Sequence, residues 1–200
     1  MKVGIFGGTF DPVHCGHLLL AEQCREQCGL DEIRFVPTGN PPHKASANIT
    51  DGQHRAEMLE FATAGVPAFV VDRMELNRDT VTYTIDTLRE LAGQESRELY
   101  FIMGSDSLAD LPNWREPAAI LEMTHVIAVN RGGRSQPDLE PLRAQFGDVV
   151  DQKIISVAMP GIELSATDIR GRIATGKSIR FQVPRAVEAY IEEHGLYRSN

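Results

Sequence analysis

The chain has 200 residues, of which 42% are hydrophobic and 24% are charged, and its formal net charge is -8. This size and composition predict one soluble globular domain, and the acidic balance argues against extended contact with nucleic acid or an anionic membrane. No signal peptide or run of about 18 apolar residues indicates export or a membrane span, and the odd set of cysteines (Cys15, Cys24 and Cys28) favours reduced thiols in a cytoplasmic protein.

Short, apolar, β-rich runs alternate with longer amphipathic runs along the chain. The predicted strands cover residues 2–6, 33–37, 69–72, 98–103, 126–130 and 154–157. The predicted helices cover residues 17–28, 51 to about 65, 84–92, 165–174 and 184–194, with Gly29, Asp51 and Pro184 as end signals. Residues 38–48 and 131–138 are loop-like. The alternation predicts an α/β fold, a Rossmann-like doubly wound parallel sheet with helices on both faces, in a single domain over residues 1–200.

The loop between the first strand and the first helix, residues 7–17, has the sequence GGTFDPVHCGH. Gly7 and Gly8 allow backbone N–H groups to face an anion, and the dipole of the following helix favours phosphate at the same place. His14 and His17 add two ring donors. The loop lacks the end of a Walker loop and the G-x-G-x-x-G pattern, and no third ligand completes a metal site beside the histidines. We therefore predict that it holds phosphate.

This loop resembles the (T/H)xGH motif of the nucleotidylyltransferase superfamily, whose members transfer a nucleotidyl group from a nucleoside triphosphate and release pyrophosphate. The resemblance implies that His14 and His17 contact the triphosphate and stabilise its pentavalent transition state. It also implies a set of further ATP-binding residues in the loop: Gly7, Gly8, Thr9 and Phe10.

Residues 38–44, TGNPPHK, follow the second strand and resemble the Asn-Pro-Pro-His-Lys loop of bacterial nicotinate-nucleotide adenylyltransferases. The two prolines stiffen a loop that presents His43 and Lys44, and a lysine is a point charge for phosphate. The alternative is a solvent-exposed turn, in which prolines and lysine are common. The resemblance implies that Asn40 and His43 bind the mononucleotide and that Lys44 binds the phosphates of ATP.

Two further segments resemble motifs of the same family. Residues 82–88, TYTIDTL, resemble its Ser-Tyr-Thr-x-Asp-Thr-Leu, which implies contact of Thr84 with the mononucleotide. Alone, this pattern indicates only a helix start with an apolar stripe. Residues 104–108, GSDSL, resemble its Gly-x-Asp-x-Leu, so Gly104 and Asp106 are expected to bind the ribose hydroxyls of ATP.

The only tryptophan, Trp114, follows in the sequence LPNWR. A single tryptophan most often packs in the core, but the matching ring of this family stacks on the pyridine ring of the substrate. The flanking proline, asparagine and arginine favour stacking here. Residues 129–133, VNRGG, resemble the family's Arg-Pro-Gly near adenine and imply a role for Arg131, while Gly132 in place of proline predicts a more mobile loop.

Residues 162–170, IELSATDIR, form a second phosphate element. Ser165 is a natural helix N-cap, and free N–H groups, the Thr167 hydroxyl and the Arg170 guanidinium together suit β- and γ-phosphates. The alternative is a plain capped helix with a surface arginine. The segment resembles the family's Ile-Ser-Ser-Thr-x-Ile-Arg. Ala166 replaces a frequent serine, and we expect a small cost because the backbone N–H groups remain.

The resemblance implies adenylyl transfer from ATP to nicotinate mononucleotide, which gives nicotinate adenine dinucleotide and pyrophosphate in a step of NAD biosynthesis. The phosphate of the mononucleotide is the nucleophile and is mostly dianionic at pH 7, so no general base and no covalent enzyme intermediate are expected. Mg²⁺ is expected to arrive with ATP, held mainly by phosphates and water. Cys15 is expected to be a bystander.

Several alternatives stay open. The acceptor is the acid or the amide form of the mononucleotide, with the family-like loops favouring the acid. A phosphopantetheine adenylyltransferase would not need residues 40–44 or Trp114 in this form. A non-catalytic nucleotide sensor is disfavoured because His14, His17 and Arg170 are all present, and a metal-binding protein is the most distant alternative. No nucleic acid polymer or membrane is an expected partner, and a homo-oligomer is compatible with the sequence.

Overall fold

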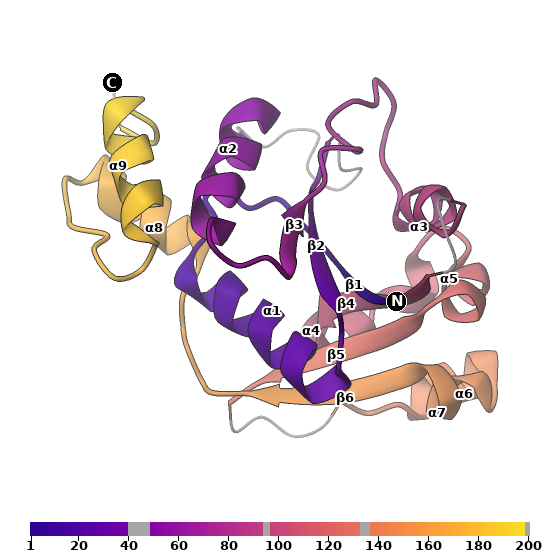
Figure 1. Cartoon of the computed structure of the whole chain (residues 1–200). Helices are drawn as coiled ribbons and strands as arrows, with labels where there is room; N and C mark the ends of the chain where they lie inside the picture. Colours follow the sequence, from indigo (N-terminus) through magenta and orange to yellow (C-terminus); the bar gives the residue numbers. More distant parts are fainter. Residues whose placement is uncertain (40–48, 94–96, 133–136, 199–200) are drawn as a thin grey trace.

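The computed structural model describes residues 1–39, 49–93, 97–132 and 137–198 (Figure 1). Within these ranges the chain forms a six-stranded sheet, parallel throughout, in the order β3-β2-β1-β4-β5-β6. The strands are β1 (Lys2–Gly8), β2 (Glu32–Pro37), β3 (Phe69–Val71), β4 (Glu98–Gly104), β5 (His125–Arg131) and β6 (Ile154–Met159). Because the strand order reverses between β1 and β4, a ligand is expected in the crevice at their carboxyl ends.

Helices cover both faces of the sheet, which confirms the predicted doubly wound α/β fold (Figure 1). The helices that pack on one face are α1 (Cys15–Cys28), α2 (Gly52–Thr63), α8 (Ala166–Ala174) and α9 (Arg185–Glu193). Those on the other face are α3 (Thr84–Ala92), α4 (Ser105–Leu108), η2 (Leu111–Asn113), α5 (Pro117–Met123), α6 (Glu140–Phe146) and α7 (Val149–Lys153).

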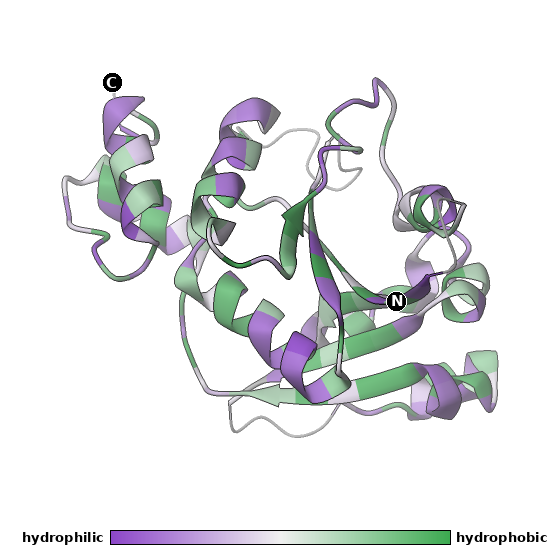
Figure 2. Cartoon of the chain, in the orientation of Figure 1, coloured by the Kyte–Doolittle hydropathy of each residue, from purple (hydrophilic) through white to green (hydrophobic). Residues whose placement is uncertain are grey.

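Neighbouring residues of one strand pack into different cores. Phe6 and Ile102 belong to the core beneath α1 and α2, whereas Ile5 and Phe101 belong to the core beneath α3 and α5. Side chains alternate across a strand, so a strand that is covered on both faces has to be apolar along its length. Figure 2 shows the central strands as mainly hydrophobic, while the helices carry both kinds of residue. This is why the strands stand out in the sequence as short continuous apolar runs.

Predicted end signals hold at three helices. Gly29 follows α1 with a φ of 60°. The Asp51 carboxylate accepts a hydrogen bond from the Gln53 N–H (2.8 Å) at the start of α2, and the Ser165 hydroxyl accepts one from the Asp168 N–H (3.1 Å) at the start of α8. Each satisfies a helix-end group that would otherwise need water. The bounds of α3 are those predicted.

Some predictions about the elements are wrong. Helix α1 begins at Cys15 and not at residue 17, so both histidines of the loop belong to the helix start. Pro184 is the N-cap of α9 and not part of its first turn. Arg131 ends β5, although the sequence placed it in a loop. The helices α4, η2, α5, α6 and α7 were not predicted, because segments of three to seven residues are too short for a helical period to show.

None of the helices in the described ranges has the length and apolar character that a membrane crossing requires.

Candidate active site

The loop after β1 turns sharply over a buried phenylalanine. Phe10 has a φ of 49° and is 2% exposed, and its ring packs edge-on against Phe6, with ring centroids 5.3 Å apart. A Cβ on Gly8 would lie 2.9 Å from the Phe10 ring, so packing by itself requires a glycine at the second position of the motif. Because the Phe10 ring is buried, any contact of this residue with ATP has to involve its backbone.

His14 and His17 lie together at the start of α1. Their rings stack with centroids 3.6 Å apart and planes inclined by 21°, and His14 is 4% exposed. The backbone N–H of His14 donates to Nδ1 of His17 (3.2 Å), so a neutral His17 carries its proton on Nε2. Gly16 makes room for this pair, since a Cβ there would lie 3.1 Å from Nδ1 of His14. The two imidazoles therefore lie together at a helix N-terminus, and their role as phosphate donors stays a prediction.

Helix α8 brings the second predicted phosphate element to the same loop. Nη1 of Arg170 donates to the carbonyl of Asp11 (2.7 Å), and Nη2 lies 3.4 Å from the Thr167 hydroxyl. The backbone N–H of Cys15 also donates to the carbonyl of Gln182, which lies beyond α8 (2.9 Å). The structure thus places Arg170 beside the His14 loop, although the two motifs are far apart in the sequence.

Sequence reasoning missed two buried charged residues beneath this loop, Asp11 and Arg55. Asp11 is 4% exposed and accepts hydrogen bonds from the Tyr197 hydroxyl (2.6 Å) and from the Thr50 N–H (3.2 Å). Burial and the nearby Asp11 carboxylate raise the pKa of Tyr197. Arg55 is 3% exposed, and burial lowers its pKa, with Asp11 opposing that shift. No pattern separates Arg55 from an ordinary helix arginine in the sequence.

A cavity of about 460 Å³ lies on the other face of the sheet, between the strands and α3. Thr84 and Trp114, both predicted to bind the mononucleotide, line it together with Gly7. The Trp114 ring is partly buried and meets Phe101 edge-on, with centroids 5.8 Å apart and planes inclined by 78°. One face of the indole is therefore not used by this aromatic contact, as a stacking role requires.

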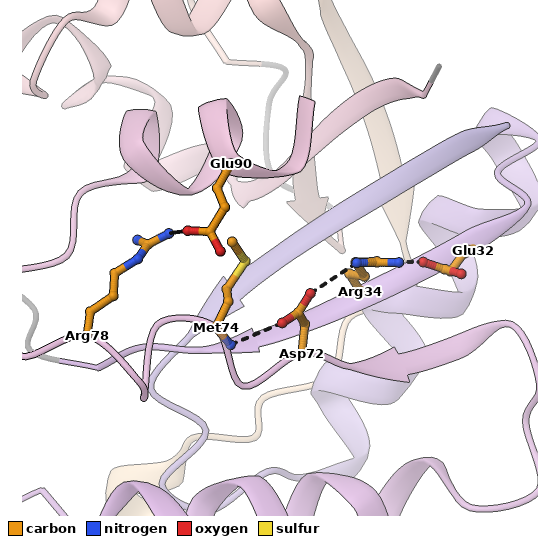
Figure 3. A network of polar contacts seen from close by, with 6 residues as sticks. All are labelled: Glu32, Arg34, Asp72, Met74, Arg78 and Glu90. Atoms are coloured by element: carbon orange, nitrogen blue, oxygen red, sulfur yellow. Dashed lines mark hydrogen bonds and ion pairs between the residues drawn. The ribbon is translucent and has the colours of Figure 1, made fainter. Parts of the chain in front are cut away.

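Polar groups hold one wall of the cavity in place. Glu75 is 7% exposed and accepts a hydrogen bond from the Thr87 hydroxyl (2.7 Å), which in turn accepts one from Nη1 of Arg78 (3.0 Å). Arg78 also forms an ion pair with Glu90 on α3, with an N–O distance of 2.6 Å; Figure 3 shows this pair. A Cβ on Gly39, which lies just after β2, would be 2.2 Å from the Glu75 carbonyl oxygen. The chain can therefore pass this wall of the cavity only with a glycine at that position.

The phosphate loop and the cavity lie on opposite faces of the sheet and meet at Gly7. Phe6 and Phe10 pack into the core beneath α1, whereas Ile5 and Phe101 pack into the core that borders the cavity. Gly7 lines the cavity and leads directly into the loop. Two ligands that enter from the two faces would meet at this crevice between β1 and β4.

Other residues were predicted to belong to the site in addition to Gly104: Asp106, Arg131, Asn40, His43 and Lys44. Gly104 ends β4 and caps α4, and Asp106 is exposed in the first turn of that helix, close in the chain to the crevice. The side chain of Arg131 lies outside the described part of the structure. Asn40, His43 and Lys44 lie outside the described residues.

Gly132 has a structural reason to replace proline. Its φ is 26°, its N–H donates to the Met159 carbonyl (3.1 Å), and a Cβ would lie 2.3 Å from Cα of Gly161. Proline has a φ near -65° and no N–H, so it fits neither feature. The expected mobility of this loop stays a prediction.

The cysteines of the described chain do not have the character of reactive nucleophiles. All three thiols are free. Burial raises the pKa of the Cys15 thiol, and burial also raises the pKa of the Cys24 thiol, to about 12 for Cys24 alone. A thiol with a raised pKa is a poor nucleophile at neutral pH. No group of three His, Cys, Asp or Glu side chains is placed to hold a metal among the described residues.

Comparisons with known proteins place the chain among proteins of related sequence. Residues 5–172 match the family model described as cytidylyltransferase-like. A relative from Thermomicrobium roseum named "Probable nicotinate-nucleotide adenylyltransferase" is 44% identical over 199 residues, which cover 99% of this chain and 92% of the relative. A relative of the same name from Dehalococcoides mccartyi is 42% identical over 199 residues, which cover 98% of this chain and 97% of the relative.

The fold is shared with a solved structure of low sequence identity. The nicotinic acid mononucleotide adenylyltransferase of Plasmodium falciparum, complexed with NaAD, superposes with a TM-score of 0.78 at 19% identity, over 98% of this chain and 97% of the other. At that identity the match supports the fold alone.

Proposed function

Because the chain belongs to the nicotinate-nucleotide adenylyltransferase family, we propose that it transfers the adenylyl group of ATP to nicotinate mononucleotide. The products are nicotinate adenine dinucleotide and pyrophosphate, and the reaction is a step of NAD biosynthesis. The observation that carries the proposal is the two-sided site: a loop of phosphate donors and a cavity with an aromatic wall meet at Gly7.

The reaction is an in-line displacement at phosphorus. A phosphate oxygen of the mononucleotide attacks the α-phosphorus of ATP, a new P–O bond forms, and the bond from the α-phosphorus to the bridging oxygen breaks as pyrophosphate leaves. The attacking phosphate monoester is already mostly dianionic at neutral pH, so the enzyme needs no base to activate it. The protein supplies alignment and stabilisation of charge.

The phosphate side of the site supplies the donors. Nδ1 of His17 accepts the His14 N–H, so a neutral His17 carries its proton on Nε2, and this N–H would donate to the triphosphate. With His14 it would stabilise charge on the α-phosphate and on the leaving pyrophosphate. Arg170 and the N-terminus of α8 would bind the β- and γ-phosphates. On the basis of the sequence alone, Lys44 is proposed to neutralise part of the phosphate charge.

The cavity side supplies orientation of the acceptor. The pyridine ring would stack on Trp114, and Thr84 would offer a hydroxyl beside it, since both residues line the cavity. Gly7 has no side chain between the cavity and the loop, and a Cβ there would make only an ordinary contact at 3.9 Å with Phe101. The acceptor phosphate would cross this point to reach the α-phosphorus. Asp106 and Gly104 would bind the ribose of ATP.

Magnesium fits this site as a companion of ATP. The described residues provide no cage of three carboxylate, imidazole or thiolate groups, and Mg²⁺ commonly keeps phosphate oxygens and water as most of its ligands. Bound in that way, it would neutralise charge on the triphosphate. Alignment of the phosphates falls to His14, His17 and Arg170.

The test is pyrophosphate release from Mg²⁺-ATP with nicotinate mononucleotide, nicotinamide mononucleotide or phosphopantetheine as acceptor. We expect the fastest turnover with nicotinate mononucleotide and none with phosphopantetheine. Faster turnover with the amide would change the assigned acceptor, and no turnover with either mononucleotide would contradict the proposal.

A further inference from the structure

Arg55 joins three backbone segments that surround the phosphate loop. It lies on α2 and is 3% exposed. Its Nε donates to the carbonyl of Thr50 (2.8 Å), Nη1 to the carbonyl of Thr9 (2.8 Å), and Nη2 to the carbonyl of Thr38 (2.9 Å). Each nitrogen of the planar guanidinium therefore binds a different stretch of chain. This is a directional contact that the single ammonium of a lysine does not reproduce.

The contact with Thr9 fixes the direction of a peptide plane in the loop. The bond between Thr9 and Phe10 is trans, so its C=O and N–H point in opposite directions. Because Arg55 holds the carbonyl, the Phe10 N–H lies on the opposite side of the loop. The buried Phe10 ring limits rotation of the same plane from its other end. An amide held in this way is a preorganised donor for an anion.

The other contacts tie neighbouring segments to the same point. The Thr38 N–H donates to the Gly8 carbonyl (2.9 Å), which continues the β1–β2 ladder into the loop. Thr50 is held from both sides, since Arg55 binds its carbonyl and the Asp11 carboxylate accepts its N–H (3.2 Å). The end of β2, the approach to α2 and the phosphate loop are thereby held as one unit.

The Asp11 carboxylate partly offsets the charge of Arg55 beneath the loop. Burial lowers the pKa of Arg55, and the carboxylate of Asp11 opposes this shift. Asp11 also accepts a hydrogen bond from the Tyr197 hydroxyl, and its carbonyl accepts one from Arg170. A buried cation whose donors all meet carbonyl oxygens costs free energy to desolvate. Arg55 lies beneath the phosphate loop, so we expect this desolvation cost to serve the alignment of that loop.

We propose that Arg55 is a positioning residue of the nucleotide site, which aligns the phosphate loop for ATP through the Thr9 carbonyl without touching substrate. The inference rests on the proposed function only in naming ATP as the ligand. It predicts that losing the guanidinium weakens ATP binding and slows turnover beyond any general loss of stability.

Arg34 offers a matched control for a test of Arg55. It is also a poorly exposed arginine, with 13% of its side chain exposed, and it is held by Glu32 (2.7 Å) and Asp72 (3.0 Å). Figure 3 shows this group at the β2–β3 side of the sheet, joined through Asp72 to the backbone of Met74. Removing Arg34 would destabilise the fold without touching the phosphate loop.

The experiment compares Arg55→Lys and Arg55→Ala with Arg34→Lys and Arg34→Ala, at a temperature where thermal unfolding shows each protein to be folded. It measures the Kd of a non-hydrolysable ATP analogue by calorimetry, and kcat and KM for both reactants. We expect kcat/KM for ATP to fall by about 10- to 100-fold in the Arg55 variants, because a small misplacement of reacting groups has effects of that order. Free guanidinium at low millimolar concentration should restore part of the ATP binding of Arg55→Ala.

Two results would overturn the proposal. One is a folded Arg55→Lys protein whose Kd for the analogue and kcat stay within about threefold of wild type. The other is an equal loss in an Arg34 variant of the same melting temperature, which would show general destabilisation. If Arg55→Ala does not fold, Arg55→Lys decides. If wild type turns over neither mononucleotide, the proposed function fails, but the Kd of the ATP analogue still tests Arg55.

Discussion

The two sides of the candidate site consist of different chemical groups, although they meet at Gly7. The phosphate side consists of backbone amides, imidazoles and a guanidinium, held by hydrogen bonds such as that between Arg170 and Asp11. The cavity side consists of side chains on the opposite face of the sheet, among them Trp114 and Phe101. Donors of the first kind recognise phosphate charge, and walls of the second kind recognise the shape of a ring. Substitutions on the two sides should therefore affect different kinetic constants.

The largest effect is expected at His17, on the phosphate side. His17→Ala should lower kcat by about 10²- to 10³-fold, the usual loss of one preorganised donor, and leave KM for the mononucleotide nearly unchanged. Steady-state kinetics with each reactant varied in turn would measure both constants. A fall in kcat of less than about tenfold would remove His17 from the catalytic residues.

Matched variants separate the two nitrogens of His17. His17→Asn keeps an acceptor near the position of Nδ1, which binds the His14 N–H, and His17→Gln keeps a donor near the position of Nε2. Because the mechanism uses Nε2, the glutamine variant should retain more activity than the asparagine variant. The reverse order would mean that the role of His17 is to hold the loop.

Arg170 should have the next largest effect. Arg170→Ala should lower kcat/KM for ATP by roughly 10- to 100-fold, since a hydrogen bond to a charged group contributes about 1.5–3 kcal/mol. Arg172 on the same helix is the control, because it donates to the Ser178 carbonyl (2.9 and 2.8 Å) and not to the loop. An equal loss in Arg172→Ala would assign the effect to the stability of α8.

Trp114 tests the cavity side. Trp114→Ala should raise KM for the mononucleotide by about tenfold, in line with the contribution of one aromatic stack, and leave KM for ATP unchanged. Trp114→Phe keeps a ring and should lose much less. A rise in KM for ATP alone would place the adenine, and not the pyridine ring, against Trp114.

Cys15 should give the smallest effect, although it lies between the two histidines. Cys15→Ala should change kcat by less than about twofold. Burial raises the pKa of this thiol, so its thiolate fraction is small near neutral pH and its alkylation should still accelerate above about pH 9. Mass spectrometry after iodoacetamide treatment across this pH range would measure the rate. A rate that levels off below about pH 8 would contradict the raised pKa.

Much of this arrangement could be predicted because it depends on local patterns. The strands are apolar throughout because both faces are covered, and Ser165 and Gly29 mark helix ends by their own chemistry. The loop of His14 and the start of α8 could be singled out for the same reason, and their phosphate-binding role stays a prediction. Their approach to each other does not follow from the strand order, because α8 comes after the edge strand β6; it is shown by the hydrogen bond from Arg170 to the Asp11 carbonyl.

The parts that were missed depend on contacts between distant segments. Arg55 donates to backbone carbonyl groups, which every residue has, so no sequence pattern indicates its partners. The hydrogen bond from Tyr197 to Asp11 links residues near the two ends of the sequence. The position of the His14 loop and of the cavity on opposite faces of the sheet was also not predicted, because it depends on which of two adjacent residues, such as Ile5 and Phe6, faces each core.

The most direct test of the two-sided site uses the fluorescence of Trp114, the single tryptophan of the chain. Wild-type protein would be titrated with nicotinate mononucleotide and, separately, with a non-hydrolysable ATP analogue; the first titration would be repeated with the analogue at saturation. We expect saturable quenching of the Trp114 fluorescence by the mononucleotide and little change in it with the ATP analogue. Saturable quenching by the ATP analogue, with no response to the mononucleotide under either condition, would contradict the two-sided site.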